Sequence, residues 1–229
     1  MTWVAWRQIR AVSFGLAAVT VGFTALAFLE RTEEMGGMTR SLSIYLSLFV
    51  GALLGAPLLA QEFEHGTHRM AWTQGVTRIR WLAERYFVAL VVALAATAAV
   101  HAVTIVVAEG ASPLVLPPPL DGLGTAGAVP YARVVWMVSL GMLAGALTRR
   151  TIGAVAVTAV GWMATQFVLD TGLPRWVPRT WREDFWALQL STATALAALS
   201  VLALIGTLLT LGLLHRTPRR RPALLERTS

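Results

Sequence analysis

Long runs of apolar residues, separated by short polar segments, extend along almost the whole chain. A helix needs about 20 apolar residues to cross a bilayer core of about 30 Å. Runs of this length occur six times, at roughly 11–29, 41–60, 86–108, 128–148, 151–170 and 186–214. The pattern predicts an all-α, polytopic membrane protein in which residues 1–229 form one domain of six transmembrane helices.

Arginine is distributed unequally between the two sides that this pattern defines. The side with both termini, the 61–85 connection and the turn at Arg149 and Arg150 holds thirteen arginines and four acidic residues. The other side holds six arginines and eight acidic residues. Because basic residues stay on the cytoplasmic side of a membrane, we expect both termini in the cytoplasm. The Arg, Ala, Gly and Val bias is typical of a GC-rich genome, and we expect a bacterial plasma membrane.

Composition excludes several kinds of chemistry. The chain is 56% hydrophobic and 14% charged, whereas soluble domains carry about 25% charged residues. The net charge of +7 lies between the apolar runs, so we expect no nucleic-acid partner. All nineteen basic residues are arginine, and cysteine is absent. A P-loop lysine, a Schiff-base lysine, thiol catalysis and thiolate metal sites are therefore excluded, and any ATP must be bound by another chain.

The first apolar run has a second interpretation. Arg7 and Arg10, the apolar run and the triplet Ala25–Ala27 also fit a cleaved signal peptide. Small residues recur in the run at spacings of four and three, at Ala11, Gly15, Ala18, Gly22 and Ala25. This spacing forms one helical stripe on which another helix can pack, and it favours a retained helix. Gly141 and Gly145 form a GxxxG packing motif on the fourth predicted helix.

The 61–85 connection is the most informative polar segment. Pro57 precedes it and is expected to bend the second helix near its exit. Gly66 and Gly75 interrupt helical runs, so a short surface helix over 67–74 is plausible. Physical reasoning alone leaves this interpretation and a solvated loop equally open.

The motif in this connection resembles that of type-2 ATP-binding-cassette exporter permeases. The resemblance lies in Glu62-x-Glu64-x-Gly66-Thr67, followed by Val76-x-Arg78 and an apolar helix. The passage over 139–150 is similar to the tightly turned fourth and fifth helices of that family. The resemblance implies that 61–85 is a coupling segment that contacts a cassette ATPase. Glu62 and Glu64 would pair with basic groups or cap the short helix, and Arg78 would meet the partner or lipid phosphates.

The same resemblance implies an assembly and a function. Two six-helix permease copies, as a homodimer or heterodimer, would join two copies of the ATPase. ATP and Mg would lie on the ATPase, with no catalytic residue, cofactor or metal in this chain. We expect export of a hydrophobic or amphipathic substrate such as a drug, a peptide or a lipid. The alternative is a non-catalytic membrane partner, such as an immunity or signalling component, that works without an ATPase.

Two further groups of residues have a functional and a structural interpretation. Thr97, His101 and Thr104 share one face of the third predicted helix. They could line a substrate path, but a histidine bonded to a neighbouring helix is the favoured alternative. Glu62, Glu64, His65 and His68 crowd together, yet they do not form an HExxH pattern, and we expect no metal site there.

Overall fold

The computed structural model describes residues 14, 17, 18, 20–22, 44–66, 77–111, 127–172 and 185–216, and every long element among them is a helix. Among these residues, five helices are long and apolar enough to cross a membrane: Ile44–Glu64, Ile79–Ala102, Val129–Thr148, Thr151–Thr171 and Trp186–Gly212. The predicted all-helical membrane fold is therefore confirmed. The six described residues of the first apolar run are helical, but most of that predicted span lies outside the described residues.

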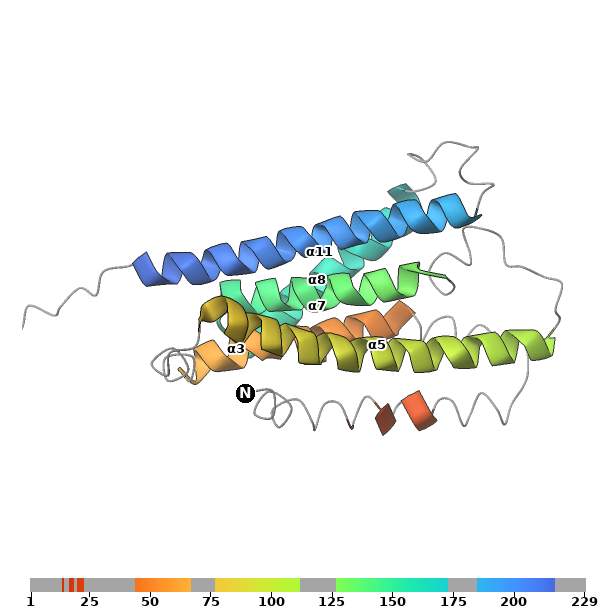
Figure 1. Cartoon of the computed structure of the whole chain (residues 1–229), viewed down its shortest axis with the longest axis horizontal. Coiled ribbons are helices and arrows are strands. Elements are labelled where there is room, and N and C mark those ends of the chain that lie inside the picture. The colour runs from red at the N-terminus through yellow and green to blue at the C-terminus, as the bar shows by residue number, and fades with distance from the viewer. Residues whose placement is uncertain are drawn as a thin grey trace, which may run out of the picture.

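Helices α3, α5, α7 and α11 run along one long axis, α8 crosses them obliquely, and α7 (Val129–Thr148) lies at the centre (Figure 1). Helix α7 packs against α3 (Ala56–Glu64), α5 (Arg78–Ala111), α8 (Thr151–Phe167) and α11 (Phe185–Arg216). At one end, here the Glu64 end, α3 stops, α5 starts and α7 turns into α8. The opposite end, the Val129 end, is where α7 and α11 start.

The helices extend further than the apolar runs that predicted them. Helix α3 continues to Glu64, and α5 already begins at Arg78, so both ends of the 61–85 connection are helical. Helix α5 has 34 residues, which corresponds to about 51 Å and exceeds the bilayer core. An apolar run measures only the part of a helix that lies in lipid, whereas backbone hydrogen bonding continues beyond it. The predicted short helix over 67–74 lies outside the described residues.

A wide turn precedes the proline of the second span. Residues Gly51–Gly55 form a π-helical turn, η1, and the Ala56 N–H donates to the Gly51 carbonyl five residues earlier. Pro57 has no N–H, and its ring crowds the carbonyl one turn back in a regular α-helix. The wider turn directly before Pro57 lies where the sequence predicted a bend.

Glycines allow α7 and the Ile44–Glu64 helix to approach each other at backbone distance. A Cβ added to Gly141 would lie 2.5 Å from the Gly51 carbonyl oxygen and 2.7 Å from the Ala56 nitrogen. One added to Gly145 would lie 2.7 Å from the Ala56 oxygen. The GxxxG pair of α7 therefore packs within this chain, against the turn that contains η1 and the start of α3.

Of the other two predicted packing glycines, the structure describes only Gly22. Gly15 lies outside the described residues. A Cβ on Gly22 would have no described atom within 4 Å. The packing role of the first helix stays a prediction.

Gly141→Ala should destabilise the bundle because its added methyl group would meet backbone atoms that cannot turn aside. We expect a loss of about 1–3 kcal/mol in the free energy of unfolding, as in other overpacked interiors. The matched control is Gly212→Ala on α11, where no described atom lies within 4 Å of the added Cβ. Thermal unfolding of the purified chains in detergent measures both, and equal midpoints for the two variants would contradict the packing argument.

Candidate functional site

A buried ion pair joins the end of α3 to the start of α5. The Arg85 Nη2 atom donates to the Glu62 Oε1 atom at 2.9 Å, and both side chains are almost fully buried. The Arg85 guanidinium also lies over the Trp81 ring, 4.6 Å from its centroid. Removing one partner of a buried pair leaves an uncompensated charge and costs about 3–5 kcal/mol. The pair therefore holds the two helix ends together.

The second glutamate of the motif caps a different helix. The Glu64 Oε2 atom accepts hydrogen bonds from the Thr151 N–H at 3.1 Å and from the Thr151 hydroxyl at 2.7 Å. Thr151 is the first residue of α8, whose first backbone N–H groups have no partner within the helix and carry a partial positive charge. Arg150, at the N-cap position, makes no side-chain capping bond. Glu64 supplies that cap from α3.

The backbone conformation at position 66 favours glycine. Helix α3 ends at Glu64, His65 follows in helical conformation, and Gly66 has a φ of 70°. Residues with a Cβ atom rarely adopt this left-handed conformation, which commonly ends helices. Gly66 thus turns the chain away directly after the two glutamates.

The start of α5 is set by Thr77, which the sequence analysis missed. The Thr77 hydroxyl accepts a hydrogen bond from the Arg80 N–H at 3.4 Å, three residues into the helix. A threonine before an apolar helix is a recognised N-cap signal and would have placed this boundary. Arg80 forms an exposed ion pair with Glu84 one turn later, at 3.1 Å.

The tight turn between α7 and α8 places Thr151 next to Glu64. Arg149 ends α7 with a φ of 55°, in the left-handed region, and its N–H donates to the Gly145 carbonyl. Arg150 is extended, and α8 starts at once. The α7–α8 turn therefore presents the start of α8 to the end of α3.

Together these contacts attach the α3 end of the connection between α3 and α5 to two membrane helices. Its α3 end is bonded to α5 through Glu62 and to α8 through Glu64. Thr67 and Val76 lie outside the described residues, as does the Arg78 side chain, although Arg78 is the first residue of α5. A force on this connection would reach α5 and α8 directly.

The glutamates and histidines that crowd together in the sequence have separate partners in the described part of the chain. Glu62 and Glu64 bind Arg85 and Thr151, and the His65 Nδ1 atom donates to the Gln61 carbonyl at 2.8 Å. His68 lies outside the described residues. No group of three potential metal ligands occurs among the described residues.

The polar face of α5 bonds within the bundle. Thr97 is buried, and its hydroxyl donates to the Ala93 carbonyl at 2.8 Å. The His101 Nδ1 atom lies 3.0 Å from the Tyr131 hydroxyl of α7. The Thr104 side chain lies outside the described residues. Tyr86 and Ser139 form another α5–α7 hydrogen bond at 2.7 Å. These polar groups of α5 therefore form hydrogen bonds within the helix or to α7.

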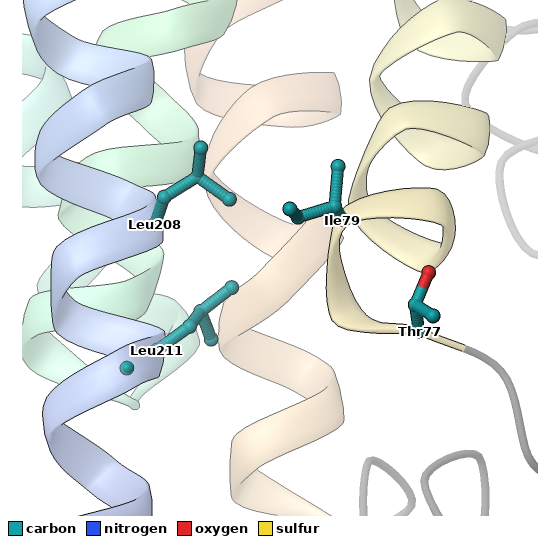
Figure 2. A pocket seen from close by; sticks show the side chains of 5 residues that line it. Thr77, Ile79, Leu208 and Leu211 are labelled. Carbon is teal, nitrogen blue, oxygen red and sulfur yellow. The ribbon is translucent and has the colours of Figure 1, made fainter.

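A cavity of about 340 Å³ opens between the start of α5 and the end of α11. Figure 2 shows Leu208 and Leu211 of α11 across from Ile79 of α5, with Thr77 at the edge. Gly212 completes the lining. The described part of the lining is apolar except for Thr77.

The comparison with protein families gives one match. A family model described as "ABC-2 membrane transporter related" matches residues 20–173. This range covers the second to fifth predicted spans and the whole of the α3–α5 connection. The searches of curated proteins and of solved structures returned no match.

The buried ion pair can be tested by a double-mutant cycle. Glu62→Gln should lower the free energy of unfolding by about 3 kcal/mol because Arg85 stays charged and buried. Glu62→Gln with Arg85→Gln should recover most of that loss. Glu64→Gln, which changes an exposed cap, is the matched control and should cost less. Chemical denaturation in mixed micelles measures these three variants together with Arg85→Gln alone and the wild type. Additive effects of the Glu62 and Arg85 substitutions would exclude the pair as a stabilising contact.

Proposed function

The chain belongs to the ABC-2 membrane transporter related family, and on that premise we propose that it is the permease subunit of an ATP-driven exporter. The permease would have six transmembrane helices, the first over 11–29, and both termini in the cytoplasm. It would contain no catalytic residue. A cassette ATPase, encoded as a separate chain, would bind ATP and Mg and supply the energy.

The observation that carries this proposal is the double attachment of the Glu-x-Glu motif. An ATPase that binds the 65–77 connection and changes conformation would displace the end of α3. Glu62 would pass the displacement to α5 through Arg85, and Glu64 would pass it to α8 through Thr151. Helices whose ends are joined by hydrogen bonds would move together, as in a hinge or shear movement of a membrane domain. A solvated loop without such contacts would absorb the same force.

The arginine distribution supports a cytoplasmic Glu64 end. Arg149 and Arg150 lie at the α7–α8 turn, and Arg80 and Arg85 lie in the first turns of α5. Basic residues flanking short connections set the orientation of membrane helices. The 65–77 connection would then face the compartment that contains ATP.

The outward face of α8 is apolar. Ile152, Val160 and Phe167 are 86%, 61% and 69% exposed, so this apolar face is covered by lipid or by a second copy. We propose two permease subunits with two ATPase subunits. The substrate would be hydrophobic or amphipathic, because apolar residues line most of the bundle.

Glu64→Lys should abolish the stimulation of the ATPase by the permease. A lysine there would place a positive charge against the positive end of α8, next to Arg150, and would release the cap. The matched control is Glu84→Lys, which changes another carboxylate of the same region that has only an exposed partner. The measurement is ATP hydrolysis, in nanodiscs, by the complex of the permease with a cassette ATPase that co-purifies with it, together with the amount of permease in the membrane.

Each result of that experiment has a definite meaning. Loss of stimulation with normal membrane insertion supports coupling through Glu64. Normal stimulation by the Glu64→Lys variant removes the α3–α8 contact from the mechanism. A wild-type chain that recruits no ATPase would instead favour the non-catalytic membrane partner.

His101→Leu should leave stimulated ATP hydrolysis and transport unchanged while lowering the unfolding temperature. The substitution removes the partly buried hydrogen bond with the Tyr131 hydroxyl, and such a bond contributes about 0.5–1.5 kcal/mol. Adding Tyr131→Phe should restore the stability. A transport defect in both the single and the double variant would place His101 in a substrate path with Thr97 and Thr104.

A further inference from the structure

Arg133 is a buried arginine near the Val129 end of the bundle. It lies one turn inside α7, within a candidate membrane span, and is 4% exposed. Its Nε and Nη1 atoms are buried and have no hydrogen-bond partner among the described residues. Charged side chains at such depth normally pair with another group or face a polar path. Among the described residues, the Nε and Nη1 atoms of Arg133 therefore lack the partners that a buried guanidinium normally has.

The described carboxylate that interacts with the Arg133 charge is not a hydrogen-bond partner of its guanidinium. Asp170, in η2 (Val168–Gly172), acts on the Arg133 charge through space. No ion pair within 4.0 Å joins these two described side chains, and Asp170 is exposed. Arg85, at the other end of the bundle, shows the contrast, because its buried guanidinium has a carboxylate at 2.9 Å.

Two hydrogen bonds fix the level of Arg133 in the bundle. The Val129 N–H, one turn before Arg133, donates to the Gln189 Oε1 atom of α11 at 3.0 Å. The Trp136 Nε1 atom, one turn after it, donates to the Thr165 hydroxyl of α8 at 3.0 Å. Arg133 thus lies between the contact of α7 with α11 and the contact of α7 with α8.

Further polar atoms on the adjacent turns also have no described partner. The Gln166 Oε1 atom follows Thr165 on α8, and the Thr192 hydroxyl lies one turn beyond Gln189 on α11. A hydroxyl can donate, and an amide can turn its NH₂ group to where its oxygen lies. The level of Arg133 therefore holds three potential donors from three helices. Such a set suits an anion with several oxygens, which a guanidinium binds in bidentate fashion.

We propose that Arg133, assisted by Gln166 and Thr192, binds the carboxylate or phosphate group of an anionic amphipathic molecule at the Val129 end of the bundle. The proposal rests on the proposed transport function, because it assigns the charge of the cargo. The apolar part of the molecule would lie along the helices, and its anionic group would neutralise the guanidinium.

The test compares two probes that differ in one charge. The full wild-type chain in nanodiscs of phosphatidylcholine is titrated with 11-(dansylamino)undecanoic acid and with its methyl ester, by dansyl fluorescence. We expect the acid to bind at least about tenfold more tightly, as charge-assisted hydrogen bonds require. Arg133→Gln should remove this preference, whereas Arg133→Lys should retain part of it. Arg80→Gln, which changes an exposed arginine at the other end, should keep it.

Competition identifies the source of the anion. Weaker acid binding in nanodiscs that contain phosphatidylglycerol supports a lipid headgroup as the ligand. Weaker acid binding with inorganic phosphate supports a free anion. Equal binding of acid and ester by the wild-type chain overturns the proposal without any variant, as does an unchanged preference in a folded Arg133→Gln protein. No ATPase is present, so a failure to recruit one would leave this result intact.

Discussion

The contact between α7 and the Ile44–Glu64 helix is the constraint from which the rest of the structure follows. Lipid supplies little hydrophobic force between helices, so close packing has to hold them together. Gly141 and Gly145 bring the backbone of α7 to that of η1 and α3. Because Gly145 lies against Ala56 near the end of α7, the last turns of α3 run beside the α7–α8 turn. Glu64 can therefore reach Thr151, 87 residues further along the chain.

The two glutamates of the motif have different physical roles although they are two residues apart. Glu62 is buried and neutralises Arg85, so its contribution depends on charge in a medium of low dielectric constant. Glu64 is exposed and satisfies backbone groups at the start of α8, so its contribution depends on hydrogen-bond geometry. The first contact resists separation of α3 and α5, and the second aligns α8. Gly66 then turns the chain away from the end of α3.

Apolar runs were sufficient to predict the five described candidate spans, because the bilayer core requires about 20 apolar residues in each of them. The partners of Glu62 and Glu64 could not be predicted, since periodicity carries no information about residues 23 and 87 positions away. Thr77 was predictable as a helix cap. Arg133 was counted only as one basic residue on its side of the membrane, because a sequence does not show that a side chain is buried. The π turn at Gly51–Gly55 likewise has no reliable sequence signal.

That turn determines the direction in which the carboxylates point. A π turn accommodates an extra residue, and each residue rotates the following helix by about 100°. Loss of one residue between Gly51 and Gly55 would leave the apolar face before the turn in place. Glu62 and Glu64 would then swing around the helix axis, away from Arg85 and Thr151. The number of residues in this short glycine-containing segment thus determines the direction in which Glu62 and Glu64 point around the helix axis. In relatives that carry the same glutamates after a regular helix, these side chains would have to contact different neighbours.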